Sequence, residues 1–190
     1  MIRAASLLLT ALLLSACAGP APDSSRPTAW LKPGVKVTLP PPGIHPAFQQ
    51  QQLLTGQVKG QSQSLLVLLS ADEQQIDLAG LSSVGIRLFS LRYDARGIHT
   101  QQLMPLPQMP PASQVLADIM LSYWPRDVWL KQLPSGWRLE DQGLKRRLFD
   151  ADNQLVTEID YLQRGSLRQP ISIRQHAFGY QIRIQHLDAS

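Results

Sequence analysis

Residues 64–70 read SLLVLLS, and this apolar run decides the fold class. The run is short and lies between turn residues, which favours a β-strand covered on both faces over the rival interpretation as a buried helix. Four more strands are expected in this half of the chain, at residues 51–59, 75–81, 86–93 and 98–103. Residues 94–97 (DARG) predict a hairpin turn between the last two. The short links favour an antiparallel meander.

The C-terminal half continues the strand pattern. Tyr180, Ile182 and Ile184 alternate with polar residues, which is typical of a strand with one covered face. Candidate strands lie at residues 137–141, 144–149, 155–162, 171–177 and 180–187. About ten strands are too many for a small flat sheet, so the sequence predicts a strongly curved antiparallel sheet or barrel.

A helical segment separates the two halves. Ser113 is a candidate N-cap, and Pro125 ends the predicted helix. One apolar face recurs at helical spacing, and it consists of Val115, Leu116, Ile119, Met120, Tyr123 and Trp124. A short second helix is expected over residues 127–133. The predicted fold class is therefore mainly β with a helical insertion.

The first residues are typical of a bacterial lipoprotein signal. Arg3 supplies positive charge, and the apolar stretch over 7–14 is too short to span a bilayer. Residues 14–17 (LSAC) resemble the lipobox, in which the leader is cleaved before the cysteine and the cysteine is acylated. The alternative is an ordinary signal peptide with an incidental cysteine. The lipobox resemblance implies an envelope protein that faces the periplasm, and the lack of aspartate at Ala18 favours the outer membrane.

The single cysteine and the prolines set the expected domain organisation. Because Cys17 is the only cysteine, a disulfide within the chain is excluded and a thiol enzyme is not expected. Prolines are frequent up to residue 46, which predicts an extended tether without a packed core. We therefore expect a signal peptide at 1–16, lipidated Cys17 and a proline-rich tether at 17–47, and a folded domain at 48–190.

The sequence lacks the motifs of several common enzyme classes. No GxSxG, HExxH, P-loop or GxGxxG pattern occurs. Residues 150–153 (DADN) resemble part of a calcium loop but lack its glycine and final glutamate, which favours a hairpin turn. Four acids lie nearby in the sequence: Glu140, Asp141, Glu158 and Asp160. Two interpretations of them stay open, an acid–base pair or a solvated strand face. With four scattered histidines, we expect no enzyme activity, no metal and no cofactor.

Basic residues gather in the C-terminal half, at Lys145, Arg146, Arg147, Arg164, Arg168, Arg174 and Arg183. A formal net charge of +4 is compatible with nucleic-acid binding, but a periplasmic anchor argues against that partner. The remaining interpretations are contact with anionic lipid or lipopolysaccharide and an ordinary solvated surface, and the second is favoured.

Six short motifs carry a family resemblance. They are LLTG at 53–56, LSSVGIRLF at 81–89, YWP at 123–125, GWRL at 136–139, PISI at 170–173 and YQIRIQHL at 180–187. In this order, and with the lipobox, they resemble the outer-membrane lipoprotein receptor LolB and its periplasmic relative LolA. The chain is more closely similar to a lipoprotein family of unknown function from aryl-polyene biosynthesis gene clusters.

The resemblance implies a curved antiparallel half-barrel with helices over its open side. Its apolar interior would shield acyl chains from water, a gain of about 0.8 kcal/mol per methylene. The candidate cargo-binding residues are Leu66, Leu68, Leu78, Leu88 and Ile182, although strand parity does not identify the concave face. The helix residues Leu116, Ile119, Met120 and Trp124 form either a lid over the interior or simple core packing, and packing alone is favoured.

The resemblance also implies a membrane-contact loop. In the receptor family, a loop with a Pro-Leu-Gly motif presents an apolar residue that helps to place cargo in the membrane. Ser83-Val84-Gly85 aligns with that motif, so Val84 is the matching position. The alternative is an ordinary hairpin turn.

The sequence thus predicts a non-enzymatic lipoprotein at the periplasmic face of the outer membrane that binds or positions a hydrophobic or acylated cargo. The cargo would be a lipoprotein or an aryl-polyene lipid, received from a LolA-like carrier. Membrane lipid is the expected partner of acylated Cys17. The alternatives are a structural or accessory lipoprotein that recruits an envelope complex, and a hydrolase or transferase, for which no motif is found.

Overall fold

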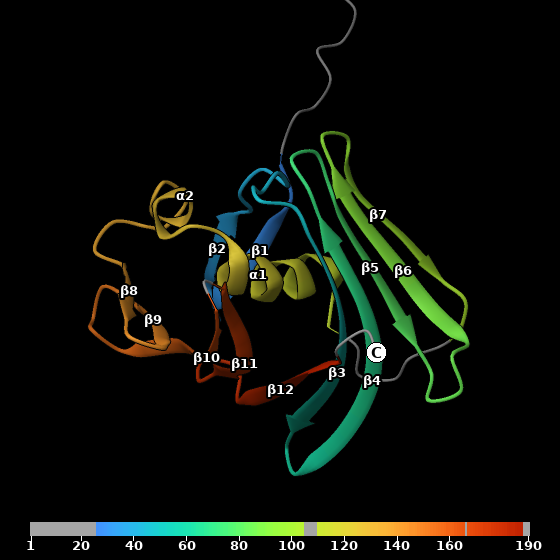
Figure 1. The fold of residues 1–190 in the computed structure, drawn as a ribbon. Coiled ribbons are helices and arrows are strands. Elements are labelled where there is room, and N and C mark those ends of the chain that lie inside the picture. Colours follow the sequence, from blue (N-terminus) through green and yellow to red (C-terminus); the bar gives the residue numbers. More distant parts are fainter. Residues whose placement is uncertain (1–25, 105–109, 166, 188–190) are drawn as a thin grey trace, which may run out of the picture.

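One curved sheet forms the body of the protein (Figure 1). The computed structural model describes residues 26–104, 110–165 and 167–187, so Cys17 and the predicted leader lie outside the described residues. In the described part, ten antiparallel strands pair in the order β7-β6-β5-β4-β3-β12-β11-β10-β9-β8. The sheet does not close into a barrel, and its edges are β7 and β8. The predicted mainly β fold with a helical insertion is confirmed.

The element bounds follow the sequence prediction closely in both halves. The strands of the large sheet are β3 (Phe48–Val58), β4 (Gln61–Ala71), β5 (Ile76–Leu81), β6 (Arg87–Asp94), β7 (Gly97–Gln102), β8 (Arg138–Gln142), β9 (Lys145–Phe149), β10 (Leu155–Arg164), β11 (Leu167–Gln175) and β12 (Tyr180–Leu187). The helices are α1 (Ala112–Tyr123) and α2 (Arg126–Leu130). Among these described elements, no helix has the length and apolar character needed to cross a bilayer.

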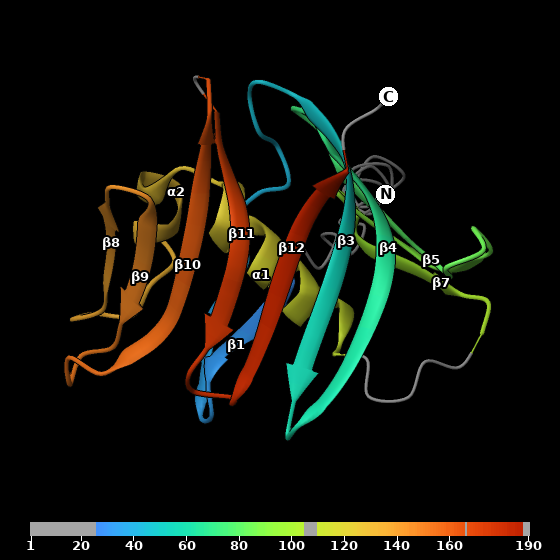
Figure 2. The same cartoon turned by 60° about the horizontal axis from the view of Figure 1, so that its bottom comes forward.

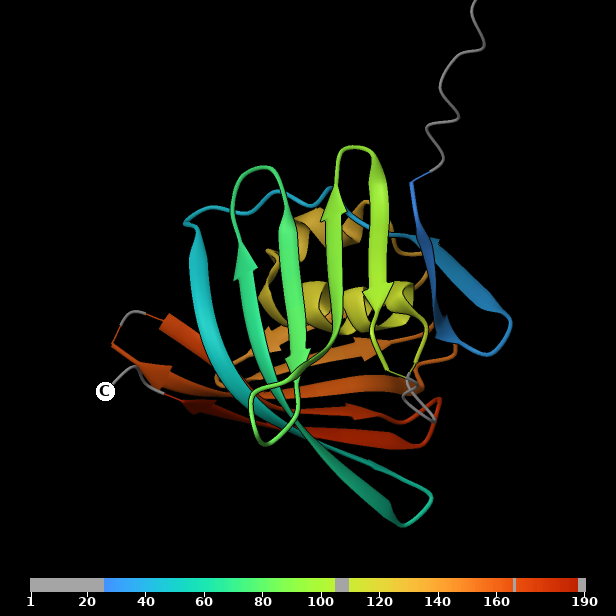
Figure 3. The same cartoon turned by 90° about the vertical axis from the view of Figure 1, so that its right-hand side faces the viewer.

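The first and last strands of this sheet are neighbours at its centre. β12 pairs with β3 from Tyr180 opposite Val58 to Leu187 opposite Gln51. Figure 2 shows β12 between β11 and β3, with α1 on the far side of the sheet in that view. The two halves of the chain therefore form one sheet that curves around α1 (Figure 3).

The apolar run of residues 65–69 forms the centre of β4, but only one of its faces is covered. Val67 and Leu69 are buried in the core, whereas Leu68 is 39 % exposed and Leu66 is half-buried. Successive side chains of a strand point to opposite faces, so Leu66 and Leu68 lie on the outer face. The expectation of a strand covered on both faces is wrong, because the helices pack on the inner face alone.

A hairpin precedes the sheet where a tether was expected. It consists of β1 (Thr28–Lys32) and β2 (Val35–Thr38), which pair antiparallel. Three of its apolar side chains, and Leu39 directly after β2, are at most 5 % exposed and belong to the core: Ala29, Leu31, Val37 and Leu39. Lys32 Nζ also pairs with Asp150 Oδ2 at 2.7 Å. The prediction of a tether without a packed core is therefore wrong for this segment, because alternating apolar residues between the prolines bury one face of the hairpin.

Helix α1 is held at its carbonyl end by buried side chains. The last carbonyls of a helix have no partner within the helix, so other groups must satisfy them. Arg146 Nη1 donates to the carbonyl oxygens of Leu121 and Trp124, both at 2.8 Å, and the Tyr161 hydroxyl donates to that of Ser122 at 2.8 Å. The Arg146 guanidinium also binds Asp141 through two 2.8 Å hydrogen bonds. These contacts fix α1 relative to β9 and β10.

The amino end of α1 differs from the expected cap. Pro111 occupies the N-cap position and no side chain caps the helix, so Ser113 is not the N-cap that the sequence predicts. Proline fixes its own φ near a helix-compatible value, which favours this start without a side-chain cap. The helix then buries Leu116, Met120 and Leu121 against the sheet.

Replacement of Arg146 tests the role of this cap. Arg146→Met should lower the free energy of unfolding by about 3 kcal/mol, because two helix carbonyls and the Asp141 carboxylate lose their buried partner. Urea denaturation followed by circular dichroism measures the loss. Arg96→Ala, at an exposed turn, is the control and should change the value by no more than about 0.5 kcal/mol. Equal effects of the two substitutions would contradict the account.

Candidate binding site on the inner face of the sheet

Half-buried apolar side chains gather where α1 faces the centre of the sheet. Val115 and Ile119 lie four residues apart on one face of α1, so they are neighbours along the helix. They are joined by side chains from the inner faces of β3, β4 and β12, and we call the set the inner apolar patch: Leu54, Leu65, Val115, Ile119 and Ile182. All five contact the core without being fully buried.

Gly56 leaves space within this patch. It lies on the inner face of β3 between Leu54 and Val58, directly opposite Ile182 of β12. A methyl group built on Gly56 would have one neighbour within 4 Å, the carbonyl oxygen of Gln63 at 3.9 Å. A methyl group on Gly80 of β5, by contrast, would overlap the Phe89 ring. Gly80 is thus required by packing, whereas Gly56 borders open space.

A polar link bounds the patch at one end. The Tyr123 hydroxyl donates to Gln50 Oε1 at 2.6 Å and accepts from Gln52 Nε2 at 2.7 Å. Its ring stacks on Phe48 with ring centroids 4.8 Å apart. Burial raises the pKa of Tyr123 above its usual range, so the hydroxyl stays protonated. This link fixes the last turn of α1 to the inner face of β3.

A second polar link bounds the patch at the other end. Asp118 of α1 is 4 % exposed and accepts hydrogen bonds from Tyr180 Oη at 2.6 Å and Gln175 Nε2 at 2.8 Å. Thr157 Oγ1 donates to Gln175 Oε1 at 2.9 Å and orients that amide. Burial raises the pKa of Asp118 to about 6, although the bonds from Tyr180 and Gln175 oppose the shift. Since Gln52 and Tyr180 lie at opposite ends of the β3–β12 pair, the patch lies between the two links.

A separate apolar surface lies at one end of β5, β6 and β7. Its four side chains are strongly exposed, and we call them the apolar tip: Val84 (78 %), Ile86 (59 %), Leu103 (49 %) and Met104 (51 %). The Ser82 hydroxyl closes the β5–β6 turn by accepting the Ile86 N–H at 3.1 Å, and the Leu103 N–H binds the Leu88 carbonyl at 2.8 Å. The β5–β6 turn is at the opposite end of the molecule from the start of β1 (Figures 1 and 3).

A family model matches residues 49–188, which cover all but the first residue of the ten-stranded sheet. Its description is a protein of unknown function, DUF3261. The chain belongs to the DUF3261 family. A comparison with curated proteins gave no match. In this DUF3261 protein the match begins at the second residue of β3, so the β1–β2 hairpin lies outside it although it packs into the same core.

The structure divides the predicted cargo-binding residues of the DUF3261 protein between locations. Ile182 belongs to the inner apolar patch, and Leu78 faces inward but is only 4 % exposed within the core. Leu66 and Leu68 lie on the outer face, and Leu88 lies half-buried where the β5–β6 register shifts. Leu66 and Leu68 therefore cannot line an interior site, because strand parity places them on the side away from α1.

The predicted lid is mostly core. Leu116, Met120 and Trp124 are at most 1 % exposed, and Trp124 Nε1 binds the Pro41 carbonyl at 3.1 Å. Packing is therefore the observed role of these three residues. Ile119 is the exception, since it remains half-buried in the inner apolar patch. The sequence prediction missed Leu54, Gly56, Leu65 and Asp118, although glycine within a strand is itself a signal of close approach or open space.

Most of the predicted basic surface is neutralised within the DUF3261 protein. Arg174 binds Glu158 Oε1 at 2.6 Å and Asp160 Oδ2 at 2.7 Å. Lys145 pairs with both acids, and Arg147 pairs with Glu158. The ion pair with Arg147 lowers the pKa of Glu158, so this residue is not poised to donate a proton near neutral pH. The acids of β10 form a charge network at the sheet surface rather than an acid–base pair.

Residues 150–153 form a turn, as one sequence interpretation proposed. Asp150 Oδ1 accepts the backbone N–H groups of Asp152 at 3.0 Å and Gln154 at 2.8 Å, which is the bonding of an Asx turn. Asn153 adopts φ +62°, a left-handed conformation that asparagine tolerates. Across the described ranges, no cluster of three histidine, cysteine or acidic side chains is arranged to hold a metal ion.

The raised pKa of Asp118 predicts a pH-dependent stability. An unfolded aspartate titrates near pH 3.9, so between about pH 4 and pH 6 the folded protein holds a proton that the unfolded chain has lost. The free energy of unfolding should therefore fall as pH rises through this window. Urea denaturation should show wild type losing about 2 kcal/mol relative to Asp118→Asn between pH 4 and pH 7. Parallel pH profiles for the two proteins would contradict burial of an ionisable Asp118.

Proposed function

We propose that this DUF3261 protein is a lipid-anchored protein of the bacterial envelope that binds a hydrophobic or acylated cargo on the inner apolar patch. The observation that carries the proposal is the space at Gly56, which is surrounded by half-buried apolar side chains between two polar links. Half-buried apolar groups gain free energy when a ligand covers them. The proposal requires no catalytic step.

The size of the patch sets the expected affinity. A chain that buries about ten methylene groups gains about 8 kcal/mol before the cost of association is subtracted. Binding should therefore be no tighter than micromolar. Such an affinity suits a protein that receives and releases a cargo. On the sequence resemblance, we propose a lipoprotein acyl chain or an aryl-polyene lipid as cargo and a LolA-like periplasmic carrier as donor.

Two membrane contacts complete the proposal. Acylated Cys17 would anchor the protein at the periplasmic face of the outer membrane, and the apolar tip around Val84 would be the second contact. Nine residue-to-residue steps separate Cys17 from Arg26, which corresponds to a reach of about 30 Å for an extended chain. We propose that this segment lets both contacts reach one bilayer.

Close packing of the interior favours a second candidate function. Leu116, Met120 and Trp124 fill the space under the sheet that an enclosed lipid cavity would occupy, and Leu68 leaves an apolar group on the outer face. An accessory lipoprotein that recruits an envelope complex through its surface would need no interior site. This candidate predicts that filling the space at Gly56 leaves function unchanged.

Filling the space at Gly56 tests the cargo site. The Cys17→Ser protein, which cannot be acylated, should bind a fluorescent fatty-acid probe in proportion to protein. Gly56→Leu in that background should weaken binding at least about fivefold, since the new side chain occupies the place of the cargo. Thermal unfolding should show unchanged or slightly higher stability, because glycine in a strand costs about 0.5–1 kcal/mol.

Thr55→Leu is the matched control, because it adds a similar side chain to the neighbouring position on the opposite face of β3. It should leave probe binding unchanged. Equal loss in the two variants would contradict a site on the inner face, and wild-type protein that takes up no probe would contradict the proposed function.

A charge at the apolar tip tests the membrane contact. Val84→Asp in the Cys17→Ser protein should lower the fraction that floats with phospholipid vesicles about tenfold, because an apolar side chain is lost and a carboxylate must approach the acyl region. Ala95→Asp places the same charge in the exposed β6–β7 turn at the other end of the strands and should have little effect. Similar flotation of the two variants would exclude the tip as the contact.

A further inference from the structure

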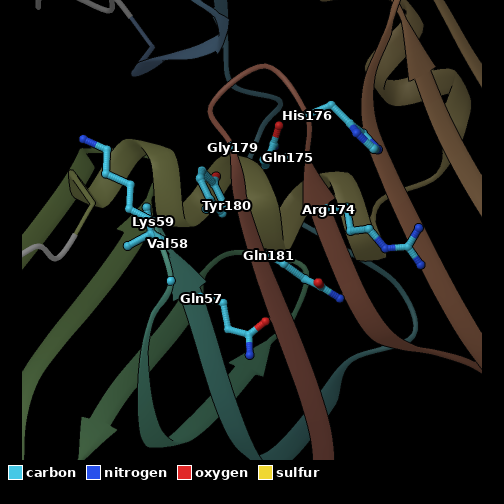
Figure 4. A pocket seen from close by; sticks show the side chains of 10 residues that line it. Gln57, Val58, Lys59, Arg174, Gln175, His176, Gly179, Tyr180 and Gln181 are labelled. Carbon is cyan, nitrogen blue, oxygen red and sulfur yellow. The ribbon is translucent and has the colours of Figure 1, made fainter.

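A pocket opens where the β3–β4 turn meets the β11–β12 turn (Figure 4). Its volume is about 480 Å³, which lies within the range of small-molecule sites. The lining residues that matter here are Gln57, Val58, Lys59, His176, Tyr180 and Gln181. They come from strands that are distant in sequence and adjacent at the centre of the sheet.

The inner side of this pocket continues the inner apolar patch. Val58 and Tyr180 are register partners, and each lies two residues from a member of the Gly56–Ile182 pair on the same strand face. In Figure 4 the Tyr180 and Gln175 side chains point toward α1, whereas those of Gln57 and Gln181 lie on the other side of the strands. An elongated ligand could therefore lie along the patch with one end in the pocket.

The mouth of the pocket carries two side chains that are free to bind a ligand. Within the described ranges, the side chains of Lys59 and His176 are exposed and form no ion pair or hydrogen bond. Lys59 has φ +48° in the tight turn before Gly60, which holds it at this rim. Arg174, also at the rim, is engaged by Glu158 and Asp160. Lys59 is thus the available positive charge.

The acids near the pocket are bound by groups other than Lys59. Asp118 is buried behind Tyr180 and Gln175 and is hydrogen-bonded to both. Glu158 and Asp160 are held by Arg174, Lys145 and Arg147 on the sheet surface. The Lys59 ammonium group suits a small anionic group, because it carries a positive charge and donates hydrogen bonds.

We propose that the pocket binds the anionic head group, a carboxylate or a phosphate ester, of a single-chain amphiphile whose acyl chain lies on the inner apolar patch. Lys59 supplies the charge, His176 supplies a hydrogen bond, and Tyr180 marks the boundary with the apolar region. The chain part rests on the proposed function, whereas the head-group selectivity is new. Because Lys59 is exposed, its contribution to affinity is modest.

Matched ligands separate the head-group site from the chain site. Calorimetric titration of the Cys17→Ser protein with dodecanoate, dodecyl phosphate and dodecanol should show tighter binding of the two anions than of the alcohol. Lys59→Ala should weaken binding of the anions about two- to fivefold and leave dodecanol unchanged. Lys131→Ala, at an exposed lysine after α2, is the control and should alter none of them. A selective loss with dodecanoate or with dodecyl phosphate identifies the preferred head group.

The possible outcomes distinguish failure of the head-group site from failure of the proposed cargo site. Equal affinity for the anions and the alcohol, or equal loss of all three with Lys59→Ala, would overturn the head-group site and leave the proposed cargo site standing. Protein that binds none of the three ligands would overturn the proposed function, and this inference with it. Gly56→Leu should weaken all three ligands alike, since it acts on the shared chain.

Discussion

The buried guanidinium of Arg146 determines where α1 lies, and the rest of the site follows from that position. Its hydrogen bonds to the carbonyl end of α1 and to Asp141 can form in one arrangement of helix and strands. Removal of one partner from such a buried network is costly, so the arrangement is strongly specified. With its carbonyl end fixed beside β9, α1 packs mainly against β1, β7 and β11. The inner faces of β3, β4 and β12 are then only partly covered.

Because α1 covers only part of the inner sheet face, that face holds both a buried core and the half-buried candidate site. Val67 and Leu69 of β4 are buried, whereas Leu65 two residues earlier on the same face is half-buried. Gly56 and the half-buried Ile119 and Ile182 continue the open region toward the pocket near Lys59. Tyr123 and Tyr180 fix the helix on either side of this region. Tyr123 is hydrogen-bonded to Gln50 and Gln52, and Tyr180 is hydrogen-bonded to Asp118. The candidate site is therefore a half-buried region beside a packed core on the same sheet face.

Sequence reasoning reached the fold class because its signals are local. The alternation of Tyr180, Ile182 and Ile184 and the turn at residues 94–97 each specify strand structure without distant partners. The sequence does not show which face of each strand points inward. Alternation separates the side chains into two sets, and only the position of the helix shows which set is covered. The sequence therefore predicts Leu66 and Leu68 as cargo contacts, although both face outward. The β1–β2 hairpin was missed because prolines on both sides obscured its alternating apolar residues.

The buried charges needed three-dimensional information for a different reason. Arg146 and Arg147 are adjacent and alike in sequence, yet one caps α1 in the core and the other pairs with Glu158 at the surface. Asp118 lies in the predicted helix as one polar residue among several, and its strand partners are about sixty positions away. Such pairings depend on long-range register. The glycine of LLTG was a visible clue, but only the structure shows open space beside it.

The central claim is that an acyl chain lies between α1 and the centre of the sheet. Isotope-filtered NOE spectroscopy on Cys17→Ser protein with bound dodecanoate tests this placement most directly. The account predicts contacts from the chain to the methyl groups of Leu54, Ile119 and Ile182. Contacts confined to the outer-face residues Leu66 and Leu68 would contradict it.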